Sequence, residues 1–260
     1  MTTQAQKAEL LRSLHVPGDP LIVTNVWDAV TARLVAGVPG VQAIASASHS
    51  VSYAHGVPDG EGLSLDEALA VARLIVGAVD LPVTIDFEKA YAKDAAEVEA
   101  NVGRLIATGA VGLNLEDSID GASLFPIEVA AERVSAARHA ADATGIPLVI
   151  NARVDALVRG GDWDNMVARA NAYLAAGGDC AFVLGLSNED EVARAVAAID
   201  GRISVIAGAT SVPLKRLAEL GVSRVSFGPG ILGLTLSHLR DATEQLTSRG
   251  EYPPELAFEY

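Results

Sequence analysis

Apolar and polar residues follow two different periodicities along this chain. Short runs rich in valine, isoleucine and leucine recur at intervals, and longer segments with helical periodicity lie between them. These longer segments, such as 64–79, 94–109 and 126–145, tend to open with serine, aspartate or proline and to close near glycine. Eight repeats of strand then helix predict a closed parallel barrel. We expect its strands at residues 21–24, 41–46, 82–86, 111–116, 147–152, 180–185, 203–208 and 224–228.

The fold class that we predict is α/β, as a (β/α)8 barrel of the TIM type. A length of 260 residues fits one such domain. A doubly wound open sheet is the alternative, but about six strands usually suffice for it, and no G-x-G-x-x-G follows the first run. We therefore predict one domain, residues 1–260, in which residues 243–260 form a C-terminal extension.

Charge and composition limit the partners that we expect. A formal net charge of -14 would repel phosphate backbones and anionic lipid, which argues against nucleic acid and membrane surfaces. The polar start and the interruption of the apolar stretch 68–83 by Arg73 and Asp80 predict neither a signal peptide nor a transmembrane span. The single cysteine, Cys180, excludes an intrachain disulfide framework and favours a cytoplasmic protein, with Cys180 as a buried core residue.

Polar side chains gather at three consecutive strand ends. Because side chains alternate across a strand, Asp86 and Glu88 share one face of their run, while Val83 and Ile85 share the opposite face. The same alternation puts four more polar side chains inside the barrel at the next two strand ends: Asn114, Glu116, Asn151 and Arg153. The reactive groups of such barrels lie at the carboxyl ends of the strands. The pattern predicts a site there.

Crowded carboxylates suggest a metal ion. Acids held close together in a partly buried site repel each other unless a cation neutralises them or they share protons. Oxygen ligands without nearby histidine or cysteine favour Mg²⁺, with Mn²⁺ as a substitute, and Arg153 offers a cationic fork for a carboxylate or a developing oxyanion. The alternative is structural: Asp86 and Glu88 would cap strand ends, and Arg153 would form an ion pair in the barrel rim.

Several motifs together resemble the isocitrate lyase and phosphoenolpyruvate mutase superfamily, especially its short members. The resemblance covers most of the chain, from "NVWDAVTARLV" through "GVPDGEGLSLDEAL", "LPVTIDFEKAY", "GAVGLNLEDS" and "INARVDA" to "GVSRVSFGPG". It implies an (α/β)₈ barrel with Mg²⁺ held, directly or through water, by Asp86, Glu88, Glu116 and Asp59. It also implies that Arg153, Asp86, the aromatic Trp27 and the loop residues Ser46, Ala47 and Ser48 contact a small anionic 2-oxo or 2-hydroxy acid.

The chemistry that the resemblance implies is cleavage of a C–C bond in such an acid. We expect a Mg²⁺-dependent lyase that performs oxaloacetate-like decarboxylation or retro-aldol cleavage through a metal-stabilised enolate. Arg153, Glu116 and His49 are the expected catalytic residues, with His49 as a proton donor. The alternatives are phosphonopyruvate hydrolase or phosphoenolpyruvate mutase chemistry at a P–C bond, and a barrel that binds a 2-oxo acid without turning it over.

Two loops depart from the family pattern. The segment "EDSIDGASLFP", residues 116–126, lacks the K-[KR]-C-G-H sequence of the isocitrate-type lyases and the loop asparagine of the phosphonomutases. In "KAYAKD", residues 89–94, Ala90 and Ala92 replace glycines, so we expect no positive φ there. The aromatic residues Tyr252, Phe258 and Tyr260 suggest docking onto a neighbouring subunit, and the resemblance implies a homodimer or homotetramer that exchanges the last helix.

Overall fold

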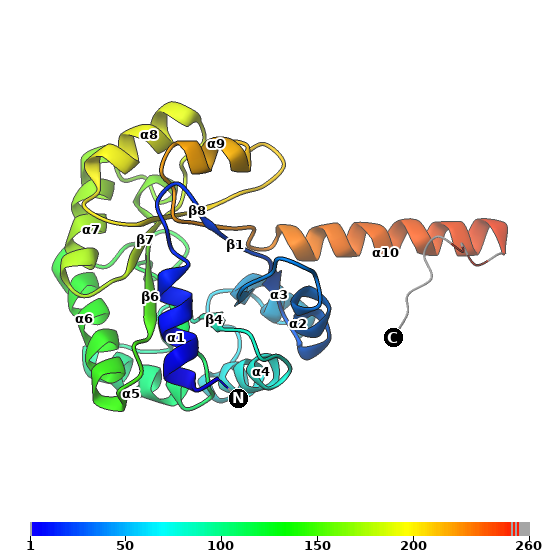
Figure 1. The fold of residues 1–260 in the computed structure, drawn as a ribbon, viewed down its shortest axis with the longest axis horizontal. Helices are drawn as coiled ribbons and strands as arrows, with labels where there is room; N and C mark the ends of the chain where they lie inside the picture. The colour runs from blue at the N-terminus through cyan, green and yellow to red at the C-terminus, as the bar shows by residue number, and fades with distance from the viewer. Residues whose placement is uncertain (1, 251, 253, 255–260) are drawn as a thin grey trace.

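Parallel strands form the centre of the molecule. The computed structural model describes residues 2–250, 252 and 254. In this part of the chain, nine strands form one sheet in the order β1-β9-β8-β7-β6-β5-β4-β3-β2. Figure 1 labels several of them. Every neighbouring pair is parallel. The strands are β1 (Leu21–Val23), β2 (Asn25–Val26), β3 (Ile44–Ser46), β4 (Val83–Asp86), β5 (Gly112–Leu115), β6 (Val149–Val154), β7 (Cys180–Val183), β8 (Ile203–Ile206) and β9 (Arg224–Ser226).

The predicted barrel is confirmed, with one strand more than expected. Each of the eight predicted runs contains a strand; the first, 21–24, contains β1, and the unpredicted strand β2 follows directly after Thr24. β1 pairs with β9, in the register Leu21 with Arg224, whereas β2 pairs with β3. The consecutive strands β1 and β2 therefore bring the two edges of the sheet together into a nearly closed ring.

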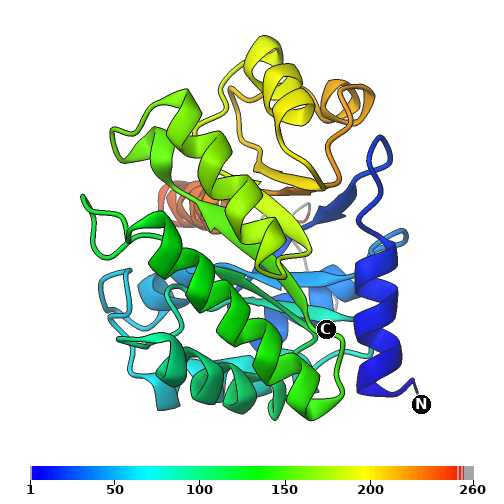
Figure 2. The same ribbon diagram turned by 90° about the vertical axis from the view of Figure 1, so that its left-hand side faces the viewer.

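Helices alternate with the strands and surround the barrel (Figures 1 and 2). The predicted helical segments are confirmed, and their caps explain the boundaries. The Ser64 and Asp94 side chains accept hydrogen bonds from backbone N–H groups in the first turns of α4 and α5, and Gly145 ends α6 with a φ of 68°. The helices are α1 (Gln4–Ser13), α2 (Ala29–Ala36), α3 (Ser48–Ala54), α4 (Leu65–Gly77), α5 (Ala95–Ile106), α6 (Ile127–Thr144), η1 (Ala156–Val158), α7 (Trp163–Ala175), α8 (Glu189–Ala198), α9 (Leu214–Glu219) and α10 (Gly230–Arg249).

Two apolar layers hold the fold together. The larger layer lies between the strands and the surrounding helices and includes Val83 and Ile85, the face of β4 that we expected to point outward. The smaller layer fills the amino-terminal end of the barrel, where Leu11 of α1 packs against inward-facing strand residues such as Leu21 and Val149. Cys180 is fully buried, as predicted. α1 thus closes one end of the barrel and leaves the opposite end for the polar residues.

The last helix leaves the barrel. α10 projects away from the other elements (Figure 1) and carries exposed leucines, including Leu234 and Leu239, which are 60% and 63% exposed. Residues 243–249 of the predicted extension continue this helix. Phe258 and Tyr260 lie outside the described residues, and Tyr252 is exposed. In the described part of the chain, no helix combines the length and the apolar character that a membrane crossing requires.

Candidate active site

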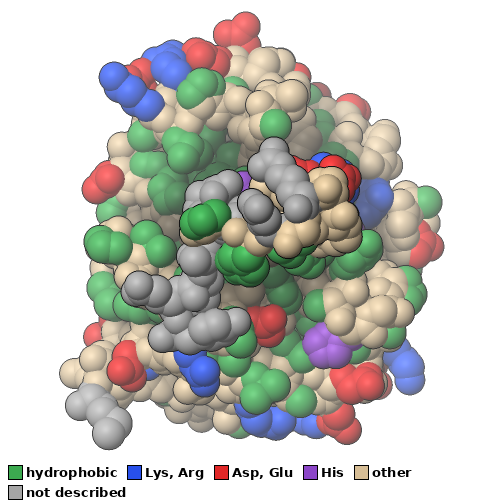
Figure 3. Space-filling model, turned by 90° about the vertical axis from the view of Figure 1, so that its right-hand side faces the viewer, with side chains coloured by type: hydrophobic (Ala, Val, Ile, Leu, Met, Phe, Trp, Pro, Cys, Tyr) green, Lys and Arg blue, Asp and Glu red, His purple; other side chains and the backbone are tan. Residues whose placement is uncertain are grey.

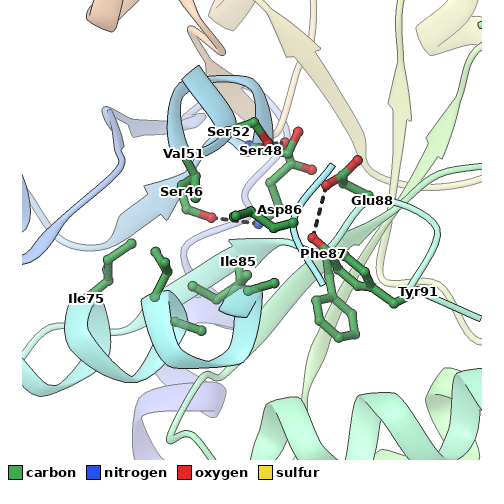
Figure 4. Close-up of a pocket in the computed structure, with 14 residues that line it drawn as sticks. Ser46, Ser48, Val51, Ser52, Ile75, Ile85, Asp86, Phe87, Glu88 and Tyr91 are labelled. Carbon is green, nitrogen blue, oxygen red and sulfur yellow. Dashed lines mark hydrogen bonds between the residues drawn. The ribbon is translucent and has the colours of Figure 1, made fainter. Parts of the chain in front are cut away.

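Asp86 occupies the carboxyl end of β4 and is fixed from three directions. Its backbone N–H donates to the Ser46 hydroxyl at 2.8 Å (Figure 4), and the Ser48 backbone N–H donates to Asp86 Oδ2 at 2.9 Å. The Asn114 side chain donates to Asp86 Oδ1 at 3.3 Å. These hydrogen-bond partners come from β3, α3 and β5, so neighbouring elements hold Asp86 at the barrel mouth. Among the described residues, its carboxylate has no direct cation partner.

Glu88 lies in a strained loop directly after β4. The expectation that this loop avoids positive φ is wrong, because Glu88, Ala90 and Tyr91 have φ values of 49°, 63° and 52°. Side chains other than glycine rarely adopt this conformation unless their surroundings impose it. Here the Tyr91 hydroxyl donates to Glu88 Oε1 at 3.0 Å, and the Glu61 backbone N–H donates to Glu88 Oε2 (Figure 4 shows the tyrosine contact). The turn thus directs a buried carboxylate toward the site.

Glu116 and Arg153 form the opposite wall. Arg153 Nη1 donates to Glu116 Oε1 at 2.6 Å, and the other side of the guanidinium contacts both oxygens of Asp155, at 2.7 and 3.1 Å. Asp155 is completely buried and also accepts from the Ser118 hydroxyl at 2.6 Å. The two acids therefore hold the guanidinium plane in one orientation, and their negative charges raise the pKa of Arg153 despite its burial.

A second layer of polar residues supports this wall. Asp117 accepts a hydrogen bond from the Asp155 backbone N–H at 3.0 Å and another from the Tyr173 hydroxyl at 2.8 Å. Arg169 contacts the same carboxylate at 3.2 Å. Burial, opposed by these donors, leaves the pKa of Asp117 raised. Residues from α7 therefore stabilise the loop after β5 from behind, out of reach of a ligand.

Two connected cavities open at this end of the barrel. The barrel mouth encloses about 180 Å³ and is lined by Asp86, Asn114 and Arg153, together with apolar residues of β7 and β8. An outer cleft of about 390 Å³ shares Asp59 and Arg153 with the mouth and adds Glu88, Glu116, Lys89 and Arg159. A third, small cavity lies between β4 and the helices α3 and α4, beneath Asp86 (Figure 4). The mouth and the cleft are the spaces that a small organic acid could enter.

The acids repel one another. Burial, reinforced by the charges of Asp86 and Asp59, raises the pKa of Glu88 to about 7. Burial also raises the pKa of Glu116. The positive charge of Arg153 opposes this rise, and the negative charges of Asp86, Asp155 and Glu88 reinforce it. Lys89 pairs with Glu61 at 2.9 Å and is therefore not available to neutralise these carboxylates. The site has an excess of negative charge.

A hydrated divalent ion fits this set of donors. All four predicted ligands offer carboxylate oxygens, the type that Mg²⁺ prefers, and their mutual repulsion is the cost that a cation would remove. In the described part of the chain, no three histidine, cysteine, aspartate or glutamate side chains converge closely enough to enclose a metal ion by themselves. An ion bound here would therefore have to take further ligands from water or from the substrate.

Some of the other residues that we predicted to contact the ligand line the mouth, and others do not. Ala47, Ser48 and the exposed His49 line the barrel mouth, and the His49 ring stacks on Tyr53. Ser46 lies under Asp86 and supports it through its hydroxyl. Trp27 is 8% exposed, belongs to the apolar core, and is not among the residues that line the mouth or the cleft. The structure thus brings most predicted residues together but places Trp27 behind them.

Sequence reasoning missed several supporting residues. Tyr91, Asp155 and Ser118 each contact a predicted site residue or its partner through a side-chain hydrogen bond. Asp155 follows Arg153 by two positions, so strand alternation could have placed it on the same face. Tyr91 could not have been found in this way, because it reaches Glu88 only through the left-handed turn.

Comparison with known proteins decides the family. The model of the family described as phosphoenolpyruvate phosphomutase matches residues 11–247. The chain belongs to this family. The resemblance to the isocitrate lyase and phosphoenolpyruvate mutase superfamily is therefore confirmed, and with it membership of a superfamily of carbon–carbon lyases and mutases.

Relatives in the family carry different activities in their names. Phosphoenolpyruvate phosphomutase of Streptomyces hygroscopicus is 27% identical over 96% of this chain and 83% of its own length. Oxaloacetate decarboxylase of a Bradyrhizobium species is 29% identical over 86% of this chain and 78% of its own length. A solved structure from Burkholderia cenocepacia J2315, described as a candidate phosphonomutase, is 37% identical, with a TM-score of 0.88 over 93% of this chain and 99% of that one.

Proposed function

We propose that this protein is a Mg²⁺-dependent lyase that cleaves a C–C bond of a small 2-oxo or 2-hydroxy carboxylic acid. The observation that carries the proposal is the convergence of Asp86, Glu88 and Glu116 with Arg153 at the mouth and the adjoining cleft, where burial and neighbouring negative charges raise the pKa of Glu88 and of Glu116. An anionic acid that chelates a cation would complete this site. The relatives named oxaloacetate decarboxylase and 2-methylisocitrate lyase support this reaction class.

In this proposal each wall of the site has its own task. Asp86, Glu88, Glu116 and Asp59 would hold the ion, Mg²⁺ or Mn²⁺, which when bound neutralises the acids and stabilises negative charge on the ligand's oxygens. Arg153, held in place by Glu116 and Asp155, binds the oxygen-rich end of the ligand through the part of its guanidinium that faces the mouth. Its fixed orientation reduces the reorganisation needed during the reaction.

The rim and the apolar wall would control protons and water. Phe182, Leu184 and Ile206 line the side of the mouth opposite the acids, where they exclude water from the breaking bond. His49 is exposed at the rim and can exchange protons with solvent, so we assign it as the donor that quenches the enolate. Decarboxylation makes the smallest demand on the short loop at 116–126, because CO₂ leaves without removal of a hydroxyl proton.

Cleavage or rearrangement of a P–C bond is the second candidate. The matching family model and the Streptomyces hygroscopicus relative both carry the phosphomutase name, which favours it. The loop between Glu116 and Pro126 contains no asparagine, a difference from the family pattern described above. We therefore rank this chemistry below C–C cleavage.

We also propose that α10 packs against another copy of the chain, in a homodimer or homotetramer. Viewed from the side to which α10 projects, apolar side chains gather around the base of the helix (Figure 3). Leu234, Leu236, Leu239 and Leu246 are all between 39% and 63% exposed on this helix. Large apolar side chains exposed in this number on one helix are typical of an interface.

The decisive experiment measures pyruvate release from a panel of acids with Mg²⁺ and with EDTA. The panel contains oxaloacetate, 2-methylisocitrate, other 2-hydroxy diacids and phosphonopyruvate, and CO₂ and phosphate are followed in parallel. We expect EDTA-sensitive turnover of one acid without phosphate release. Phosphate release would favour the second candidate, and turnover that survives EDTA would contradict the metal. Mg²⁺-dependent binding of a 2-oxo acid without turnover would identify a binding protein.

A further inference from the structure

Arg224 is a buried cation without a carboxylate partner. It begins β9, is 1% exposed, and forms no ion pair within the described residues. Its Nε and Nη1 atoms are buried and have no hydrogen-bond acceptor there. Burial lowers the pKa of Arg224 to about 10, so the guanidinium remains protonated at neutral pH. A buried charge of this kind is costly unless another charge balances it.

Asp86 is a carboxylate without a cation partner among the residues that the structure describes, and thus the counterpart of Arg224. Its carboxylate accepts hydrogen bonds from the Ser48 backbone and the Asn114 side chain, but no arginine, lysine or histidine of the described chain lies within ion-pair distance. The cations that line the mouth and the cleft have other partners, and Arg159, for example, donates to the Gly121 carbonyl oxygen. Arg153 pairs with Glu116 and Asp155, and Lys89 pairs with Glu61.

One amide connects the two unbalanced charges. Arg224 Nη2 lies 3.4 Å from Asn114 Oδ1, and Asn114 Nδ2 donates to Asp86 Oδ1 at 3.3 Å. Asn151 also donates to Asn114 Oδ1, at 2.8 Å. Arginine can only donate and an ionised carboxylate can only accept, so the amide has its oxygen toward one and its nitrogen toward the other. Strand register reinforces this arrangement, because Asp86, Asn114 and Asn151 are direct neighbours across β4, β5 and β6.

We propose that Arg224 is the counter-charge of Asp86, a positioning residue that acts through Asn114 from inside the barrel. The arrangement balances the charge of Asp86 without placing a second cation in the mouth, where a ligand and its metal ion would have to bind. Its value for catalysis rests on the proposed function. The pairing of the two charges does not depend on the proposed function, because the contacts that carry it are present without any ligand.

The test is a double-mutant cycle on stability, measured by urea unfolding with EDTA present. Arg224→Met removes the cation at similar volume, and Asp86→Asn neutralises the carboxylate. If the two charges balance each other, R224M is neutral or destabilising in the wild-type background. In the D86N background it stabilises, because it then removes a buried charge without a counter-charge. We expect the effect of R224M on the unfolding equilibrium constant to differ between backgrounds by about ten-fold, which corresponds to about 1.4 kcal/mol.

Arg133 provides the matched control. It is also 1% exposed, and two of its guanidinium nitrogens likewise lack acceptors, but it donates to the backbone carbonyls of Lys89 and Ala92. Arg133→Met should therefore lower stability to the same extent in the wild-type and D86N backgrounds. An equal effect of R224M in the two backgrounds would overturn the proposal.

Two further variants test whether the coupling passes through Asn114 and whether it depends on the charge at position 224. Asn114→Leu should reduce the coupling between positions 86 and 224, and Arg224→Lys, which keeps the charge, should behave like wild type in both backgrounds. If R224M does not fold alone, refolding on addition of D86N supports the pairing, and failure of both overturns it. The double-mutant cycle measures stability and does not depend on the acid panel. Absence of turnover in the panel would refute the proposed function, whereas only the cycle decides whether Arg224 balances Asp86.

Discussion

The two ends of the barrel are built from the same strands but have opposite character. At the amino-terminal end, Leu11 of α1 packs on Leu21 and Val149, and all three are buried apolar side chains. At the carboxyl end, the same strand that carries Val149 presents Arg153 to the mouth. Inward-facing positions of one strand thus change from apolar to charged within four residues.

This difference separates stability from chemistry along the barrel axis. The amino-terminal end gains free energy from apolar burial, whereas the carboxyl end holds acids that repel one another. Substitutions at the first end should alter stability and leave activity unchanged, whereas substitutions at the second should have their main effect on activity. The following changes test this separation, from the largest expected effect to the smallest.

Asp86→Ala should remove activity without unfolding the protein. Asp86 touches the mouth and is proposed to hold the metal ion, so we expect Mg²⁺-dependent turnover to fall by more than about a hundred-fold. Turnover of the acid found in the panel and the thermal midpoint measure the two effects. The control is Asp66→Ala, which removes an exposed carboxylate of α4. Retained turnover in D86A would exclude Asp86 from the site.

Leu11→Ala should have the opposite result. Leu11 is fully buried at the closed end, and its truncation should lower the free energy of unfolding by about 2–5 kcal/mol with unchanged kcat/KM. Urea unfolding and steady-state kinetics provide the measurements. Leu74→Ala removes a leucine that is 63% exposed and should change stability by less than about 0.5 kcal/mol. A large loss of activity in L11A would show that the two ends are coupled.

Tyr91→Phe removes one supporting contact at the mouth. The ring should keep its packing against Phe87, 5.4 Å away between centroids, but Glu88 loses a donor. We expect Mg²⁺ affinity, measured by calorimetry, to fall about 10- to 100-fold, with little change in the thermal midpoint. Tyr53→Phe, an exposed tyrosine, is the control. Equal affinities in Y91F and wild type would mean that the hydroxyl does not support the proposed ligand.

His15 should make the closed end sensitive to acid. The ring is 2% exposed and its Nδ1 lies 2.7 Å from the Leu11 carbonyl oxygen, and burial lowers its pKa from 6.5 to about 3. The unfolded chain therefore binds a proton first as the pH falls, so stability is intact above pH 6.5 and is lost progressively toward pH 3. Between about pH 6 and pH 5, wild type should lose about 1 kcal/mol more than His15→Asn. Parallel urea-unfolding profiles would contradict this.

Hydrophobic periodicity predicted the barrel because each strand and helix carries its own signal. The eight apolar runs and the alternation along β4, β5 and β6 depend only on residues close in sequence. For the same reason Asp86, Glu116 and Arg153 could be assigned to the site: alternation gives the face of each side chain, and its place at the carboxyl end of a run gives the end of the barrel. The strand at Asn25–Val26 carried no comparable signal, because asparagine is uncommon in strands and two residues are too few to show an alternation.

The rest of the site depends on contacts that local sequence does not encode. The turn at Glu88, Ala90 and Tyr91 adopts positive φ without glycine, against local preference, and this brings the tyrosine hydroxyl onto the acid. Arg224 reaches Asn114 across the barrel, from 110 positions further along the chain. Such a contact is visible only when register and barrel curvature are known.

The pairing of β1 with β9 has a consequence for how the molecule folds. Leu21 and Arg224 are direct neighbours in this pair, so ring closure must wait until segments from nearly opposite ends of the sequence meet. Contacts between such distant segments form slowly, because the chain loses much entropy before they are made. Until then both strands expose unpaired edges that can join other chains. We therefore expect the refolding yield to fall as the protein concentration rises. An agent that covers these strand edges during refolding should raise the yield.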